Sequence, residues 1–140
     1  MNDYEAIRRL LADYCFGTDT GDTDRWVGCF AGDIVWEGGA FGRFEGRDGA
    51  RAYHRGAGDA TKNFRHINTN AAIDIEGESA TVRSYVQVYD QSGAKPMIVF
   101  SGFYDDRLVK QGGRWQIRTR RLVSDVAEIA ATPVLQAQPV

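Results

Sequence analysis

The second half of this chain has a hydrophobic period of two that is sustained over four long runs. The runs cover residues 63–75, 79–91, 96–110 and 114–125, and short glycine-containing segments separate them. A period of two predicts strands, and the segments between the runs are typical of hairpin turns. Strands of twelve or more residues must twist and curl. We therefore expect an antiparallel sheet with a concave face.

The first half of the chain is predicted to be mainly helical. Apolar residues recur at helical spacing over residues 3–17, and Asp22 or Thr23 can cap a short second helix that carries Trp26, Val27 and Phe30. A third helix is expected over residues 47–57, ended by the glycines at 56 and 58. Two short strands, 34–37 and 41–44, lie between the second and third helices. The expected fold is an α+β domain in which three N-terminal helices pack on a strongly curved, mostly antiparallel sheet and leave a pocket between them.

Length and charge narrow the class of protein. A chain of 140 residues fits one domain, which we place at residues 1–127 with a C-terminal extension at 128–140. The net charge of −2 argues against nucleic-acid partners and anionic membranes, and no apolar run is long enough to cross a bilayer. The two cysteines match neither a disulfide framework nor a metal-binding spacing, so a reducing cytoplasm is expected.

Three residues are candidates for acid–base chemistry. Tyr14 and Asp19 are five residues apart at the end of the first predicted helix, and His66 follows 47 residues after Asp19. An imidazole titrates near neutral pH, a carboxylate can fix its tautomer, and a phenol can donate a hydrogen bond to a substrate oxygen. The other histidine, His54, is expected to be exposed and inert.

Each of these residues also has a purely structural interpretation. By strand parity, residues 66, 68 and 70 share one face, and Ile67, Thr69, Ala71, Ile73 and Ile75 share the other. The apolar set is the simpler choice for the packed face, which makes His66 an edge residue unless a bulge swaps the faces. Asp19 suits a turn between helices, and Tyr14 suits an apolar core.

Aromatic residues are numerous enough to line a pocket as well as fill a core. The candidates for the pocket wall are Trp26, Phe30, Trp36, Phe64, Tyr85, Tyr89, Phe100 and Tyr104. Asn68 and Asn70 can bind substrate oxygens, and Arg118 or Arg120 can reach the pocket to neutralise an anion. One histidine and one aspartate fall short of the three protein ligands of a catalytic zinc, and no phosphate-binding or dinucleotide motif is present. No metal or cofactor is expected.

Several short motifs, taken in order, carry a resemblance to a known family. They are Tyr14-x4-Asp19-x-Gly21-Asp22, Trp26…Phe30-x2-Asp33, Gly42-x-Phe44-x-Gly46-Arg47, Arg65-His66-Ile67-x-Thr69-Asn70 and Gly113-Arg114-Trp115-x-Ile117. With these motifs the chain resembles the SnoaL-like proteins of the nuclear transport factor two-like superfamily, from residue 3 to about residue 125. The resemblance implies a cone-shaped α+β barrel and a homodimer or homotrimer.

The resemblance extends to the site. Scytalone dehydratase, bile acid 7-alpha-dehydratase and hexachlorocyclohexane dehydrochlorinase use an Asp–His pair at the positions of Asp19 and His66, and the bile acid enzyme also has a tyrosine at the position of Tyr14. This implies a cofactor-independent lyase, most simply a dehydratase, that acts on a small hydrophobic cyclic or polyketide-like substrate. His66 would be the base, Asp19 would orient it, and Tyr14 would bind an oxygen. The alternatives are an isomerase with the same base, a non-catalytic binding module, and a small subunit of a ring-hydroxylating dioxygenase.

Overall fold

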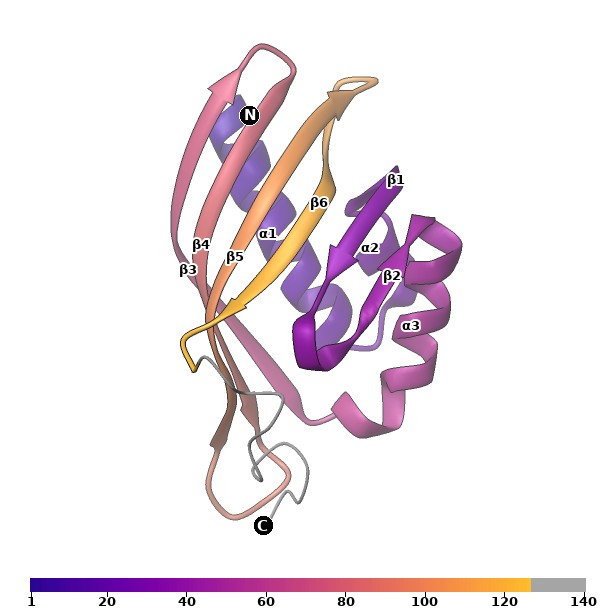
Figure 1. Ribbon diagram of the computed structural model, residues 1–140, viewed down its shortest axis with the longest axis vertical. Helices are drawn as coiled ribbons and strands as arrows, with labels where there is room; N and C mark the ends of the chain where they lie inside the picture. The colour runs from indigo at the N-terminus through magenta and orange to yellow at the C-terminus, as the bar shows by residue number, and fades with distance from the viewer. Residues whose placement is uncertain (127–140) are drawn as a thin grey trace.

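The computed structural model describes residues 1–126 of the chain, so the predicted C-terminal extension at 128–140 lies outside the described residues. The elements are α1 (Asp3–Asp19), α2 (Thr23–Val27), β1 (Phe30–Glu37), the 3₁₀ turn η1 (Gly39–Phe41), β2 (Arg43–Glu45), α3 (Gly46–Thr61), β3 (Phe64–Glu76), β4 (Ser79–Asp90), β5 (Met97–Gln111) and β6 (Arg114–Ser124) (Figure 1). No helix in the described range is both long and apolar enough to cross a membrane.

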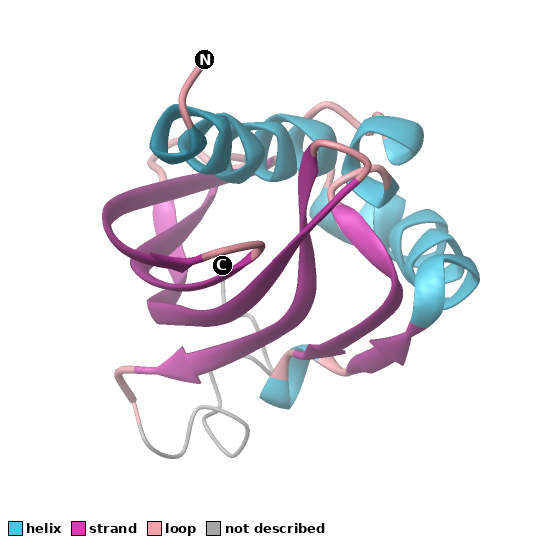
Figure 2. Ribbon diagram, turned by 90° about the horizontal axis from the view of Figure 1, so that it is seen from above, coloured by secondary structure: helices cyan, strands magenta, loops and turns pink. Residues whose placement is uncertain are grey.

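The six strands form a single curled sheet in the order β2-β1-β6-β5-β4-β3. Strand β1 pairs with β6 in parallel, and the other neighbours are antiparallel. Helix α1 lies across the sheet on its concave side, and α2 and α3 lie beside β1 and β2 (Figure 2). The predicted α+β fold is confirmed, although β2 and β3 are the two edges of the sheet and the barrel does not close.

Helix α1 brings two of the candidate residues to the sheet. It begins with a capping box in which the Asn2 side chain accepts from the Glu5 backbone and the Glu5 side chain accepts from the Asn2 backbone. Its buried face carries Ile7, Leu10, Leu11, Tyr14, Cys15 and Gly17. Gly17 is needed for close packing, because a Cβ there would lie 2.8 Å from the backbone nitrogen of Trp26. The helix continues through Gly17 and ends at Asp19, two residues beyond the predicted end.

Several further element boundaries differ from those predicted. Phe30 begins β1 instead of ending α2, because α2 is capped at Gly28. Helix α3 continues to Thr61, since Gly56 and Gly58 occupy exposed positions inside it with open space around them. The predicted second short strand at 41–44 is replaced by η1 and β2.

A β-bulge at Asn70 exchanges the faces of β3. Asn70 has φ 56°, and the pairing with β4 shifts between Thr69 and Ala72. Before the bulge the inward residues are Phe64, His66 and Asn68, and after it they are Ala71, Ile73 and Ile75. The assignment of Ile67 and Thr69 to the packed face is therefore wrong, and His66 lies on the concave side with the apolar set.

Candidate active site

The carboxylate of Asp19 binds His66 through both of its oxygens. Asp19 Oδ2 accepts from the His66 backbone N–H at 2.9 Å, and Asp19 Oδ1 lies 2.6 Å from His66 Nδ1. The two side chains are 10% and 15% exposed. Because a carboxylate is an acceptor, Nδ1 carries the hydrogen, which leaves the lone pair of a neutral imidazole on Nε2. The pair that sequence reasoning singled out is therefore brought together as an oriented imidazole.

Tyr14 lies five residues before Asp19 on the same helix and next to His66. The centroids of the two rings are 6.4 Å apart at an interplanar angle of 80°. The phenol oxygen of Tyr14 accepts a hydrogen bond from Trp36 Nε1 at 3.0 Å, so its own hydrogen is free to donate. Burial raises the pKa of Tyr14, which keeps the phenol protonated.

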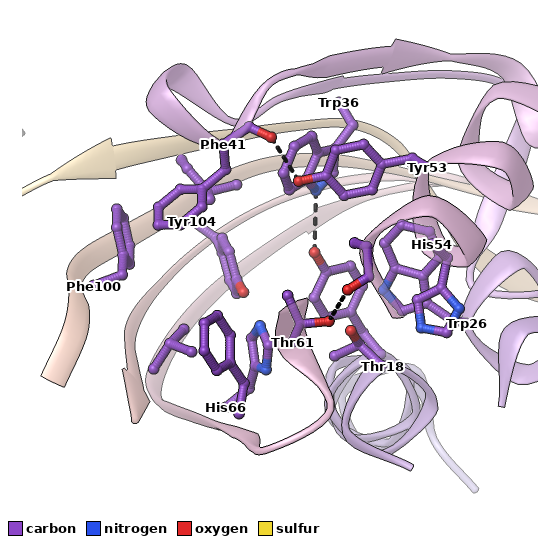
Figure 3. Close-up of a pocket in the computed structure, with 15 residues that line it drawn as sticks. Thr18, Trp26, Trp36, Phe41, Tyr53, His54, Thr61, His66, Phe100 and Tyr104 are labelled. Carbon is purple, nitrogen blue, oxygen red and sulfur yellow. Dashed lines mark hydrogen bonds between the residues drawn. The ribbon is translucent and has the colours of Figure 1, made fainter. Parts of the chain in front are cut away.

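These groups border a narrow cavity between α1, α3 and the sheet (Figure 3). Its volume is about 70 Å³. The residues that line it are Tyr14, Thr18, Trp26, Trp36, Phe41, Tyr53, His54, Ala57, Thr61, Phe64, His66, Val88, Phe100, Tyr104 and Leu122. The lining is mainly aromatic, with the imidazoles of His54 and His66 and several hydroxyl groups as its polar positions. Asp19 does not line the cavity but lies behind His66.

Five of the aromatic residues predicted for a pocket wall are in this lining: Trp26, Trp36, Phe64, Phe100 and Tyr104. Phe30 is fully buried beside them and packs edge-on against Tyr14 and Trp26, with centroids 5.9 and 4.9 Å away. It supports the cavity from behind and does not border it.

Tyr85, Tyr89 and Asn68 do not belong to the cavity. The inward positions of β4 are even-numbered, so Tyr85, which is 60% exposed, and Tyr89 lie on the outer face of the sheet. Asn68 points inward but donates to Ser84 Oγ and to the Tyr85 carbonyl, and it borders a separate groove beside α1. Asn70 forms the bulge. All four residues were predicted to contact the substrate, and none of them lines the cavity.

Arg120 does not reach the cavity to neutralise an anion. Its Nε and Nη2 donate to the two carboxylate oxygens of Asp106 at 2.8 and 2.7 Å, and both side chains are fully buried. Burial opposes the charge on Arg120, but the Asp106 carboxylate outweighs it and raises the pKa of the guanidinium. Arg118 pairs with Asp33 at the surface. Sequence reasoning missed Asp106, because an aspartate in the middle of a strand gives no sign that its partner lies 14 residues away.

His54 was predicted to be exposed, and this is wrong. It is 9% exposed, its Nδ1 lies 2.8 Å from Thr23 Oγ1, and its ring stacks on Trp26 with centroids 4.9 Å apart. The spacing of Ala50, His54, Ala57 and Thr61 places all four on one face of α3, and the first three already lie within the predicted helix 47–57. The sequence therefore contained the pattern that identifies the buried face.

No group of three or more His, Cys, Asp or Glu side chains in the described range could hold a metal ion. Cys15 and Cys29 are free and buried. Burial raises the pKa of their thiols to about 11 and about 12. They are packing residues, and neither borders the cavity.

Solved structures with this architecture include proteins to which different roles are attributed. A protein of unknown function from Mycobacterium tuberculosis is 33% identical, with a TM-score of 0.82 over 92% of this chain and 83% of that one. A protein from Novosphingobium aromaticivorans with the provisional name scytalone dehydratase is 26% identical, with a TM-score of 0.77 over 89% and 85%. The beta subunit of a provisionally identified aromatic-ring-hydroxylating dioxygenase from the same organism is 19% identical, with a TM-score of 0.77 over 89% and 90%, and it shares the fold alone.

No curated protein matches the chain in sequence. The family model that matches is that of the SnoaL-like domain, and the match covers residues 1–121. This span contains α1 to β5 and most of β6, and it includes Tyr14, Asp19 and His66. The chain therefore belongs to the SnoaL-like domain family, with the curled α+β architecture of the nuclear transport factor two-like fold.

Proposed function

We propose that this protein is a cofactor-independent lyase that removes water from a small, hydrophobic cyclic substrate. The proposal rests on the His66 imidazole, which is hydrogen-bonded to Asp19 at Nδ1 and borders an aromatic cavity. A base of this kind takes a proton from carbon, and the carboxylate behind it stabilises the imidazolium that forms.

The reaction moves protons and electron pairs only. His66 Nε2 takes a proton from a carbon next to a carbonyl group, and the electrons of the broken C–H bond form an enolate. The enolate then expels a hydroxyl group from the neighbouring carbon, and a C=C bond forms. The proton on His66 passes to the departing oxygen, so the products are the unsaturated ketone and water. Tyr14 donates a hydrogen bond to a substrate oxygen during these steps.

The lining of the cavity supports the substrate class. Rings from α1, α2, α3, β1, β3 and β5 surround the space, which favours a flat, apolar ring system, and the cavity of about 70 Å³ must widen to admit one. Polar groups are few in the lining, so the oxygens of the substrate must form hydrogen bonds with the His66 imidazole and the hydroxyl groups. The structural neighbour from N. aromaticivorans with the provisional name scytalone dehydratase makes scytalone a rational first compound to test.

The test is an elimination assay on scytalone and a panel of cyclic β-hydroxy ketones, with products identified by mass. We expect a product lighter by one water, and we expect His66→Ala and Asp19→Asn each to lower kcat/KM by about 10²–10⁴-fold. Asp59→Asn, the same chemical change at an exposed position of α3, is the control and should retain full activity.

Other outcomes separate the alternatives. A product of unchanged mass, lost in the same variants, would identify an isomerase with the same base. Full turnover in His66→Ala would end the proposal of an Asp–His base. Tight binding of panel compounds without conversion would support a non-catalytic binding module, and co-purification with a larger iron-containing chain would support a dioxygenase subunit.

A further inference from the structure

The buried ion pair of Arg120 and Asp106 has no use in the mechanism above. Arg120 comes from β6 and Asp106 from β5, and the two side chains form a two-bonded pair with no solvent contact. Transfer of two charges out of water is costly, and apolar residues of similar volume often serve stability as well or better. Stability alone therefore gives a weak reason for the pair to be there.

The guanidinium of Arg120 also lies against the rings of two tyrosines. Nη1 is buried and has no hydrogen-bond partner within the described residues. The guanidinium carbon lies 3.7 Å from the centroid of the Tyr104 ring and 4.2 Å from that of Tyr14. The two rings pack against each other edge to face, with centroids 5.7 Å apart. One cation thus holds two phenols from different elements in a fixed relation.

Both phenols are in a state to donate hydrogen bonds into the cavity. Tyr14 accepts from Trp36 and keeps its own hydrogen free. Among residues 1–126, no group hydrogen-bonds the Tyr104 hydroxyl, which points toward the side of the cavity where the His66 ring lies (Figure 3). Burial raises the pKa of Tyr104 well above its ordinary value, so this hydroxyl stays protonated.

We propose that Tyr104 and Tyr14 together bind one substrate oxygen, and that the Arg120–Asp106 pair is the positioning element that holds both phenols. A carbonyl oxygen has two lone pairs and can accept from two donors at once. When the proton leaves the neighbouring carbon, negative charge builds on this oxygen, and donors fixed in advance stabilise that charge. The guanidinium, fixed by its two hydrogen bonds to Asp106, packs against both rings and holds the two phenols in place. This inference deepens the proposed function and rests on it.

The test measures binding of a planar probe that carries the oxygen against one that lacks it. The probes are 4-nitrophenol, whose bound ionisation state is visible by absorbance, and nitrobenzene. We expect the wild-type protein to prefer 4-nitrophenol. Tyr104→Phe should lower this preference about tenfold or more, since a hydrogen bond to a charged group contributes about 1.5–3 kcal/mol. Tyr14→Phe should do the same, and nitrobenzene binding should be unchanged in both variants.

Tyr4→Phe, at an exposed position of α1, is the matched control and should leave the preference intact. The double variant Arg120→Met/Asp106→Leu removes the pair without leaving one charge unpaired. It should stay folded, bind nitrobenzene as before, lose most of the preference for 4-nitrophenol and shift the absorbance of the bound probe toward the neutral form. Circular dichroism and thermal unfolding verify that each variant is folded.

A preference for 4-nitrophenol that is unchanged in Tyr104→Phe would overturn the role of Tyr104. An unchanged preference in the double variant would overturn the role of the ion pair. These failures are distinguishable from failure of the proposed function, because the binding assay needs no turnover. If Tyr104→Phe loses the preference and the wild-type protein eliminates water from no panel compound, the oxygen-binding site would be supported and the lyase activity contradicted. Elimination with kcat/KM unaffected by Tyr104→Phe would support the lyase and overturn the role of Tyr104 in binding the substrate oxygen.

Discussion

Asp19 occupies the last position of α1, where a negative charge is unfavourable for the helix itself. The partial negative charge at a helix C-terminus opposes a carboxylate there by about 0.3–1 kcal/mol. Asp19 also does no capping for the next helix, because Asp22 accepts from the Arg25 backbone and caps α2. Both oxygens of Asp19 are instead used on His66. The local turn therefore does not explain Asp19, and the distant imidazole does.

The other imidazole, His54, is predicted to make the stability of the fold sensitive to mild acid. Burial disfavours its charged form and lowers the pKa of His54, while a hydrogen bond with the Thr18 backbone and the charge of Asp22 oppose this. The unfolded chain then binds a proton more readily than the folded protein. The contribution of His54 to stability is therefore fully present above pH 6.5, the ordinary pKa, and is lost as the pH falls through the lower pKa of the folded state.

This prediction is checked by urea unfolding of the wild-type protein and of His54→Gln at pH 7.5 and pH 5. Glutamine can still accept from the Thr23 hydroxyl but does not titrate. We expect the free energy of unfolding to fall more in the wild-type protein than in the variant over this interval. Because the carboxylates titrate in both proteins, the difference between them isolates His54. Equal losses would show that His54 remains accessible to protons in the folded state.

The bulge in β3 is the element that decides which side chains face the cavity. Strict parity along residues 64–76 places His66 opposite the apolar set Ile67 to Ile75, and the structure reconciles them by an extra residue at Asn70. Sequence alone indicated that a bulge was possible without giving its position, because asparagine is also common in strands at edges and turns. A positive φ is a backbone property that a short polar side chain tolerates but does not dictate.

Substitutions at Asn70 test the bulge. Asn70→Gly should change stability by only a few tenths of a kcal/mol, because glycine adopts φ 56° freely. Asn70→Val should cost about 1–3 kcal/mol, because a β-branched residue is strained at this φ. Urea unfolding measures both. Equal stability of the two variants would mean that the bulge relocates without cost.

A second pair of substitutions tests how closely the helices pack. Gly17→Ala places a methyl group 2.8–2.9 Å from Trp26 backbone atoms, which cannot move without shifting α2, so we expect a loss of about 1–3 kcal/mol. Gly56→Ala is the matched control, since Gly56 is an exposed helical residue with open space around it. It should stabilise the protein by about 0.5–1 kcal/mol. Thermal unfolding distinguishes the two, and a neutral Gly17→Ala would show that α1 and α2 can separate freely.

At the scale of the whole molecule, the order and type of the elements could be predicted from the sequence because they depend on local periodicity. The alternation of residues 63–125 and the helical spacing of residues 3–17 required no knowledge of tertiary contacts. Residue chemistry made Asp19 and His66 candidates, but only the resemblance implied that they pair, since nothing local links positions 47 residues apart. The Arg120–Asp106 pair, the outward direction of Tyr85 and the burial of His54 depend on which faces the sheet and helices present to one another. Periodicity does not supply that information.

The outer face of the sheet presents a row of apolar side chains to solvent. The pairing register aligns Tyr85, Phe103 and Val123 across β4, β5 and β6, with Thr69 of β3 at the end of the row and the Arg83 guanidinium 4.7 Å over the Phe103 ring. Tyr85 is 60% exposed, and Ile67 beside the row is 40% exposed. No helix among the described residues covers this face, whereas the concave face is covered by α1 (Figure 2). Apolar rows of this kind are more typical of an interface than of free surface.

We propose that a second copy of the chain covers this face, in a homodimer or homotrimer. Light scattering coupled to size exclusion should give the mass of an oligomer for the wild-type protein and that of a monomer for Tyr85→Glu, because a carboxylate at the centre of the row would be buried without a partner. Tyr4→Glu introduces the same change on the exposed side of α1 and should leave the oligomer intact. A wild-type protein that is monomeric throughout a dilution series would contradict the proposal. An oligomer that survives Tyr85→Glu would place the interface on another face of the molecule.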